Sequence, residues 1–387
     1  MSYPLSHPEI RDGVKRLCAD FDGAYWRTCD REQAYPTEFV KALTEAGYLS
    51  ALIPSAFGGL GLPLSAGAAI LEEIHRSGGN AAACHAQMYT MGTILRHGAP
   101  AQKDAYLPAI ADGTLRLQAF GVTEPTSGTD TTALRTTAKR SADGETYRVN
   151  GQKIWTSRAE HSDLLLLLAR TTPRDDVVKK TAGLSVFLVD MRDVRGTSLT
   201  IRPIRTMMNH ATTELFFDDM PVPAANLIGE EGKGFSYILA GMNAERILIA
   251  AECIGDAKWF IDQARRYACD RTVFDRPIGQ NQGIQFPIAK AYADMRAAEL
   301  MLTEAIRLYD AGGNPGEEAN IAKMLAADAA WAAAEACLQT HGGFGFAEDF
   351  DVERKYRETR LYQVAPISTN MILSYIAEHV LEMPRSY

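Results

Sequence analysis

The chain has 387 residues, of which 46% are hydrophobic and 23% are charged, values that are ordinary for a globular protein. This length exceeds what one small core organises, so we expect two or three structural layers or domains. The net charge of −8 at pH 7 argues against nucleic acid as the main partner and provides no basic surface for an anionic membrane.

Residues 1–118 are predicted to be mostly helical. Helices are expected over residues 37–46, 65–77 and 80–96, because a proline or a polar residue precedes each apolar periodic segment and glycines follow it. The glycine-rich stretch 57–61 lacks the preceding strand and the following helix of a phosphate-binding loop. We therefore predict a plain turn there.

Residues 119–228 have a different pattern, with short apolar or alternating segments bounded by turn residues. Strands are predicted at residues 146–150, 163–169, 183–190 and 213–217. Residues 142–144 (Ala-Asp-Gly) fit the tip of a hairpin, and the charged stretch 172–180 fits an exposed loop. The apolar run Leu164–Ala169 is much shorter than the roughly 20 residues that span a bilayer, so it indicates a buried strand.

The remaining residues, 229–387, are predicted to be helical. Long apolar periodicity covers residues 235–270, 285–311 and 317–340, and a glycine-rich linker at 312–316 separates the last two helices. The third helix is very rich in alanine, which permits close contact between helices in a bundle or at a subunit interface.

The cysteines and the N-terminus bear on the cellular compartment. The six cysteines lie far apart without a Cys-x-x-Cys pair, and the eight histidines show no metal-ligand spacing. This distribution favours reduced thiols and no metal site. The N-terminus carries Glu9 and Asp12 and lacks an apolar segment, so we expect no secretion or transit signal and a cytoplasmic location.

Two motifs in the middle region carry the strongest chemical signal. Residues 120–130 (Phe-Gly-Val-Thr-Glu-Pro-Thr-Ser-Gly-Thr-Asp) are rich in hydroxyls, glycine and backbone donors, which suit a pyrophosphate and the polar edge of a ring. Residues 151–157 (Gly-Gln-Lys-Ile-Trp-Thr-Ser) place Trp155 and Ser157 two positions apart, as a strand requires if both are to face one ligand.

Two further motifs follow in the helical region, Arg271-Thr-Val-Phe274 with Gln282 behind it, and residues 339–345 (Gln-Thr-His-Gly-Gly-Phe-Gly). Together with residues 213–223, and in this order, the motifs resemble those of the acyl-CoA dehydrogenase family over essentially the whole chain. Each motif alone also has a structural interpretation: Arg271 as a solvated arginine at a helix end, Gly342-Gly343 as a helix cap, and Trp155 as a core residue.

The resemblance implies an α+β fold with an N-terminal helical domain (1–118), a middle β-barrel or β-sandwich domain (119–228) and a C-terminal four-helix bundle (229–387). The implied activity is FAD-dependent α,β-dehydrogenation of an acyl-CoA thioester to the trans-2-enoyl-CoA, with electrons passed to an electron-transfer flavoprotein. It also implies a homotetramer built as a dimer of dimers.

The resemblance assigns individual residues as well. The implied FAD contacts are Phe120, Val122, Thr123, Gly128, Thr129, Trp155, Ser157, Arg271, Phe274, Gln282, Gln339, Gly342, Gly343, Ser368 and Asn370, with those of the 271 and 339–343 motifs reaching the FAD of a neighbouring subunit. The implied substrate contacts are Thr129, Asn243, Arg246 and Ala365.

The position of the catalytic base departs from the commonest family pattern. That pattern has a glutamate in a Tyr-Glu-Gly-Thr-like sequence near the C-terminus, where this chain has Pro366. Isovaleryl-CoA and long-chain members instead carry the glutamate on an earlier helix, directly before an arginine. Here Glu245-Arg246 matches, so Glu245 is the candidate base, and the alternative is an ordinary glutamate on a helix surface.

Pro366 has a second consequence, because the family uses the backbone N–H at that place to bind the thioester oxygen and proline has none. Either the Ile367 N–H replaces it, or one donor is missing. The small Ala365 in the same run favours a methyl-branched or bulky acyl group. A flavin oxidase or monooxygenase of the same fold, and a flavin-binding homologue without activity, are the alternative functions.

Overall fold

The computed structural model describes residues 7–386, so the first six residues of the predicted N-terminal domain lie outside the described residues. The chain divides into two compact units. The sheet unit comprises Tyr35–Gly61 and Ala82–Met242, and the helical unit comprises Met1–Ala34, Leu62–Ala81 and Asn243–Tyr387.

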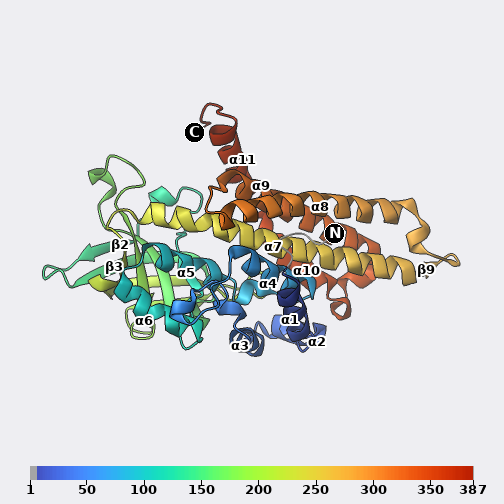
Figure 1. Ribbon diagram of the computed structural model, residues 1–387, viewed down its shortest axis with the longest axis horizontal. Helices are drawn as coiled ribbons and strands as arrows, with labels where there is room; N and C mark the ends of the chain where they lie inside the picture. The colour runs from blue at the N-terminus through green and yellow to red at the C-terminus, as the bar shows by residue number, and fades with distance from the viewer. Residues whose placement is uncertain (1–6, 387) are drawn as a thin grey trace. The chain divides into compact units, whose positions relative to one another are not determined.

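The sheet unit contains one connected β-sheet (Figure 1). Its strands are β1 (Ala119–Gly121), β2 (Thr137–Arg140), β3 (Thr146–Ser157), β4 (Leu164–Arg170), β5 (Leu184–Asp190), β6 (Leu199–Pro203), β7 (Thr212–Pro223) and β8 (Leu227–Ile228). The order is β6-β7-β3-β2-β4-β5-β8, and β1 pairs in parallel with β4. The predicted strands and the hairpin tip between β2 and β3 are confirmed, although β3 and β7 extend well beyond their predicted ends.

Strand β4 explains the uninterrupted apolar run in the sequence. Leu164, Leu166 and Leu168 belong to one apolar core, shared with residues of α5 (Ala86–His97) and α6 (Pro100–Ala111). Leu165 and Leu167 point to the opposite face and belong to a second core. Because successive side chains of a strand alternate between faces, a strand covered on both sides must be apolar at every position.

The helices of the sheet unit include α3 (Thr37–Glu45), which confirms the prediction for that segment. The helix predicted over residues 80–96 is correct only from Ala86 onward, because a 3₁₀ turn (Ala81–Ala83) precedes α5. The physical reason is that the Ala81 N–H donates to the His75 ring Nε2 at 3.1 Å, which ties the start of this segment to a side chain.

The helices of the helical unit are α1 (Pro8–Cys18), α2 (Gly23–Glu32), α4 (Leu64–Arg76), α8 (Gln282–Asp310), α9 (Gly316–His341), α10 (Val352–Thr359) and α11 (Thr369–Tyr375), together with most of α7 (Gly234–Asp270). Helices α7, α8 and α9 run side by side (Figure 1), with Lys258 of α7 bound to Glu299 of α8 at 2.5 Å. The buried face of α9 is lined by alanines at helical spacing, which permits this close approach. No helix in the described part of the chain has the length and apolarity needed to cross a bilayer.

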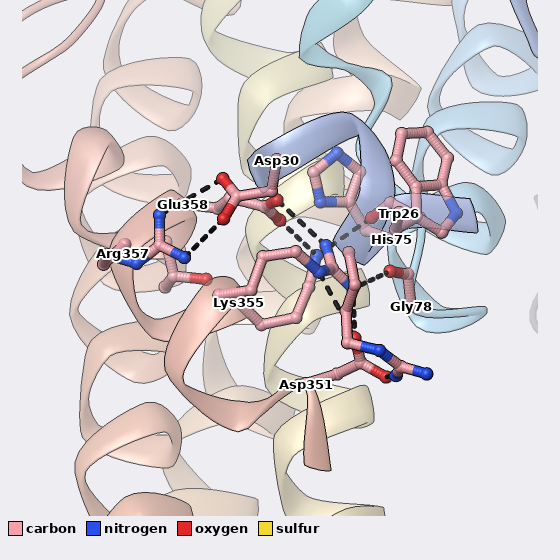
Figure 2. Close-up of polar contacts among 12 residues, drawn as sticks. Trp26, Asp30, His75, Gly78, Asp351, Lys355, Arg357 and Glu358 are labelled. Atoms are coloured by element: carbon pink, nitrogen blue, oxygen red, sulfur yellow. Dashed lines mark hydrogen bonds and ion pairs between the residues drawn. The ribbon is translucent and has the colours of Figure 1, made fainter. Parts of the chain in front are cut away.

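A group of charged side chains lies inside the helical unit (Figure 2). Asp256 of α7 accepts from Lys355 Nζ at 2.5 Å and contacts His75 Nδ1 at 2.9 Å, and all three residues are 0% exposed. Arg354 donates to the Gly78 carbonyl at 3.0 Å and to the Glu358 carboxylate at 2.9 Å. We call His75, Glu252, Asp256, Arg354, Lys355 and Glu358 the buried ion network.

Candidate active site

The two motifs of the middle region are bound to each other in the sheet unit. Lys153 of β3 is 0% exposed, and its Nζ donates to the Val122 carbonyl and to the Glu124 carboxylate, both at 2.9 Å. The Ile154 N–H donates to the Thr123 carbonyl at 2.9 Å. These bonds hold the backbone of the first motif against the second motif.

Glu124 fixes the far end of the same loop. Its carboxylate accepts the N–H groups of Arg135 at 2.6 Å and of Thr136 at 2.9 Å. Burial alone would raise the pKa of Glu124, but the Lys153 ammonium and these N–H donors outweigh it and hold the pKa below its usual value. Burial also lowers the pKa of Lys153 to about 8, against the attraction of Glu124. Gly128 lies within the loop that this pair holds.

The loop and the end of β3 expose the side chains expected at a flavin. Gly128 and Thr129 are exposed, and a Cβ added at Gly128 would meet only Thr123 Cγ2, at 3.9 Å. Trp155 is 58% exposed and adopts a φ of 61° within a β-bulge. A left-handed backbone is uncommon for a tryptophan, and such strain concentrates at functional sites. Ser157 is half-buried.

Two hydroxyls beside these residues have no hydrogen-bond partner within the described residues. Ser127 Oγ and Thr156 Oγ1 are both buried and unpaired. Buried hydroxyls normally find a partner, so a bound polar group is the expected one. Phe120 and Val122 are half-buried and pack against the apolar core, which leaves the polar atoms of the loop to meet a ligand. Hydroxyls, open glycine and an exposed aromatic ring fit the phosphates and the flat ring of FAD.

In the helical unit, a second group of predicted residues gathers where α7 and α9 end. The Arg271 guanidinium lies 5.7 Å from the ring of Phe344, and the rings of Tyr267 and His341 stack at 4.2 Å. The other members are exposed: Phe274, Gln282, Gln339, Gly342 and Gly343. Within residues 7–386, a Cβ added at either glycine would meet no atom within 4 Å beyond its neighbours in the chain.

Phe274 has the most unusual environment of this group. It is 94% exposed, and its backbone φ is 51°. An exposed phenylalanine beside Arg271 and open glycines suits a contact with another chain and an anionic group.

The candidate base lies on α7. Glu245 is 7% exposed and Arg246 is 9% exposed, which differs from the exposure of an ordinary residue on a helix surface. Arg246 Nη1 donates to Asn243 Oδ1 at 3.0 Å. Burial lowers the pKa of Arg246, and the negative charge of Glu245 opposes this change. The three predicted residues of this segment therefore form one local polar group.

The last group of predicted residues lies in the segment after α10. Lys323 Nζ donates to the carbonyls of Tyr362 and Ile367, both at 2.7 Å. Ala365 is half-buried. The Ser368 hydroxyl caps α11 by accepting the Met371 N–H at 3.4 Å, and Asn370 of α11 is exposed.

Sequence reasoning missed the residues that hold these segments. Lys153 and Glu124 were part of the motifs but had no assigned role, and Lys323 was not singled out. One signal was available: Lys153 stands at a strand position where alternation places buried residues. A lysine on the alanine-lined face of a helix, as Lys323 is, gives a similar signal.

Family models for the acyl-CoA dehydrogenase N-terminal, middle and C-terminal domains match residues 5–114, 119–220 and 232–381. The chain is 31% identical over 383 residues to the acyl-CoA dehydrogenase FadE12 of Mycobacterium tuberculosis, covering 98% of this chain and 96% of that protein. It is 33% identical over 358 residues to acryloyl-CoA reductase (NADH) of Anaerotignum propionicum, covering 91% and 89%.

Among solved structures, a glutaryl-coenzyme A dehydrogenase in complex with glutaryl-CoA superposes with a TM-score of 0.91 at 28% identity, covering 100% of this chain and 98% of that one. The fold and the motifs thus define a flavoprotein oxidoreductase. The chain belongs to the acyl-CoA dehydrogenase family, as the motifs predicted.

Proposed function

We propose that this protein is an FAD-dependent acyl-CoA dehydrogenase that converts an acyl-CoA thioester to its trans-2-enoyl-CoA and passes the electrons to an electron-transfer flavoprotein. The family match supports the reaction type, since this family is FAD-dependent. The observation that carries the proposal is Glu245, a buried carboxylate beside Arg246 on α7. It stands where the resemblance puts the base.

The chain's own residues supply the binding surface for the cofactor. Trp155 and the hydroxyls of Ser127, Thr156 and Ser157 offer an aromatic face and donors, and Gly128 lets backbone approach closely. Arg271 and the 339–343 turn offer a cation and open backbone, which we assign to the FAD of a neighbouring subunit in a dimer of dimers. When bound, FAD supplies the acceptor for the hydride that leaves the β-carbon.

Glu245 takes the proton in this reaction. The α C–H bond breaks, its electron pair forms the new C=C bond, and the proton ends on the Glu245 carboxylate. Excluding water from around a carboxylate strengthens it as a base, because the charged form loses its solvation. Arg246 and Asn243 hold each other at the same helical turn, which fixes the surroundings of the base.

The thioester oxygen gains negative charge as the α-proton leaves, so it needs a donor. The Ile367 N–H donates no hydrogen bond to any residue in the described range, whereas those of Val364 and Ala365 are bound by the Leu361 carbonyl. We assign the thioester oxygen to the Ile367 N–H, in place of the N–H that Pro366 lacks. Ala365 would leave room beside it for a branched acyl group.

Replacing Glu245 with glutamine tests this function. The variant keeps the shape of the side chain but removes the proton acceptor, so substrate-driven flavin reduction should slow by about 10²- to 10⁴-fold. FAD content should not change. The measurement is anaerobic stopped-flow bleaching of the flavin with a panel of branched and straight acyl-CoA thioesters. Near wild-type rates for Glu245→Gln would refute the assignment of the base.

Two other reactions fit the same fold. The similarity to acryloyl-CoA reductase favours the reverse direction as a second candidate, in which an enoyl-CoA is reduced. A flavin oxidase would instead react rapidly with oxygen after reduction. Mixing the reduced, product-bound enzyme with oxygen identifies an oxidase. Comparing acyl-CoA oxidation with an electron-transfer flavoprotein as acceptor and enoyl-CoA reduction with NADH as donor separates the dehydrogenase from the reductase.

A further inference from the structure

Lys323 of α9 is a buried cation whose partners are unusual. It is 0% exposed, and its Nζ donates to two main-chain carbonyls, those of Tyr362 and Ile367, at 2.7 Å each. Lys355, equally buried, pairs instead with the Asp256 carboxylate at 2.5 Å. Both hydrogen bonds of the Lys323 ammonium go to main-chain carbonyls, whereas Lys355 pairs with a carboxylate and also donates to the Gly79 carbonyl at 2.9 Å.

The segment between these two carbonyls has few hydrogen bonds of its own. The N–H groups of Val364 and Ala365 both donate to the Leu361 carbonyl at 2.9 Å. Pro366 has no N–H, and the Ile367 N–H is unpaired within residues 7–386. Past Ala365, the bond from Lys323 to the Ile367 carbonyl is what ties this backbone to the helices.

The beginning of the segment is anchored twice. The Tyr362 hydroxyl donates to the Glu252 carboxylate at 2.8 Å, and the Tyr362 carbonyl accepts from Lys323. At the end of the segment, the Ile367 carbonyl accepts from Lys323, but the Ile367 side chain adds no second hydrogen bond. Loss of the Lys323 ammonium should therefore free the Ile367 end and leave the Tyr362 end with its hydroxyl anchor alone, so that the turn formed by the Val364 and Ala365 N–H groups loosens between them.

Burying the Lys323 ammonium has a cost in folding free energy. Burial lowers the pKa of Lys323, because taking an ammonium out of water disfavours its charge. An apolar residue of similar shape would pack without that loss. Among smaller effects on this pKa, the positive charge of Arg246 lowers it and the negative charge of Glu245 raises it.

We propose that Lys323 is a positioning residue that, by binding the carbonyls of Tyr362 and Ile367, fixes the 362–367 segment and orients the Ile367 N–H toward the thioester oxygen. The two hydrogen bonds from Lys323 to the Tyr362 and Ile367 carbonyls support the first part of this proposal, that Lys323 fixes the segment. Only the last step, toward the thioester, depends on the proposed function.

The test compares Lys323→Met with a matched control on the same helix. Methionine keeps the length and removes both hydrogen bonds. Asn320→Ala is the control, because Asn320 is also buried and donates to a carbonyl, that of Gly316 at 2.7 Å within its own helix. Both variants lose a buried donor of α9, but only Lys323→Met releases the 362–367 segment.

Hydrogen exchange gives the readout that requires no substrate. In Lys323→Met, the Val364 and Ala365 amides should exchange about tenfold faster or more, the scale of a lost hydrogen bond to a charged group. In Asn320→Ala, their rates should stay within about threefold of wild type. Equal rates in wild type and Lys323→Met would overturn the fixing of the segment, whatever reaction the enzyme performs.

Kinetics test the second step. With FAD content unchanged, Lys323→Met should lower kcat for acyl-CoA oxidation by about 100-fold, as expected when a donor is misplaced by about 1 Å, with a smaller change in KM. If the amides exchange faster in Lys323→Met while kcat stays unchanged, Lys323 fixes the segment but does not orient the Ile367 N–H toward the thioester oxygen. If wild type itself reduces no flavin with any thioester, the proposed function fails while the exchange result still stands.

A second variant covers poor folding of Lys323→Met. Tyr362→Phe removes the hydroxyl anchor to Glu252 and leaves Lys323 in place. Our proposal expects the Val364 and Ala365 amides to stay protected in this variant, within about threefold of wild type. Loss of their protection would show that the tyrosine hydroxyl, and not Lys323, holds the segment.

Discussion

The two units of this protein differ in how much charge they bury. In the sheet unit, leucines of β4 are buried on both faces of the sheet, in two apolar cores. In the helical unit, α9 is lined by alanines and the buried ion network lies within the same unit. Both units bury apolar side chains, but the helical unit also encloses a network of paired charges, so its stability should depend more strongly on those pairs.

The difference follows from what each element can bury. A strand covered on both faces is apolar at most positions, because each position is inside, and β4 is apolar up to Arg170 at its end. A helix lined by small residues brings neighbouring helices close, and long charged side chains such as Lys355 and Arg354 then reach backbone carbonyls and carboxylates. A buried ion pair adds little net free energy of folding, but removing one partner strongly destabilises the protein, because the other charge is then buried without a partner.

The largest expected effect is therefore the removal of one partner from the buried ion network. Lys355→Met should lower the free energy of unfolding by about 3–5 kcal/mol, because Asp256 then lacks its ammonium partner in the interior. Urea unfolding of the purified protein measures it. Lys290→Met, which removes an exposed pair with Asp294, is the control and should change little. A loss below about 1 kcal/mol for Lys355→Met would contradict the comparison.

The sheet unit should respond to lost volume instead of lost charge. Leu166→Ala removes buried methyl groups from β4 and should cost about 2–5 kcal/mol through lost burial and the remaining cavity. Unlike the effect of Lys355→Met, this cost should barely depend on pH between 5 and 8. The core around Leu166 is built of apolar side chains, and burial raises the pKa of Tyr106, which packs against it, above its usual value of 10. Unfolding at pH 5 and pH 8 checks this, and a strong pH dependence of the Leu166→Ala difference would show that the two units are not distinct in this respect.

What the sequence predicted follows the same division. The apolar run of β4, the hairpin tip and the long helices α7 to α9 were predicted from periodicity and turn residues. The ion network was not, because Asp256 and His75 are 181 positions apart and each looks like a helix-surface residue in sequence. The late start of α5 also depended on a contact, that of Ala81 with His75, which no local pattern encodes.

The candidate site shows the same limit. The motifs predicted which residues would face a ligand, but not the Lys153–Glu124 bond that joins the two motifs, which spans 29 positions. The β-bulge and left-handed backbone at Trp155 are likewise tertiary features. Regular alternation, which the sequence argument assumed for Trp155 and Ser157, does not describe this part of the strand.

Acid should destabilise the helical unit through Glu72. Burial alone would raise the pKa of Glu72, but Lys258 at 2.6 Å and Arg11 at 2.8 Å outweigh it and hold the pKa below its usual value of 4.5. A carboxylate with a depressed folded pKa contributes stability that is complete above its unfolded pKa, and this contribution is lost as the pH falls through the folded value.

Glu72→Gln should therefore cost about 1.5–3 kcal/mol at pH 7, the scale of hydrogen bonds to a charged group, and the cost should shrink below pH 4.5. Thermal unfolding from pH 7 to pH 3.5 measures both. Glu304→Gln, at an exposed pair with Arg307, is the matched control and should leave the profile unchanged. A constant Glu72→Gln difference across this range would contradict the assigned direction.

The smallest effect concerns the thiols, whose reaction rates show whether the interior of either unit opens to solvent. Five of the six free cysteines are buried and Cys269 is exposed. Burial raises the pKa of Cys18 and of Cys337 to about 12, so their reactive thiolate is scarce at pH 8. Titration with a disulfide reagent at pH 8 should modify about one thiol in the native protein and all six after denaturation.

Cys269→Ser should abolish the rapid native reaction. Rapid modification of a second thiol in that variant would show that one of the two interiors opens readily, and peptide mapping of the modified cysteine would identify the unit, since Cys84 belongs to the sheet unit and the other buried cysteines to the helical unit.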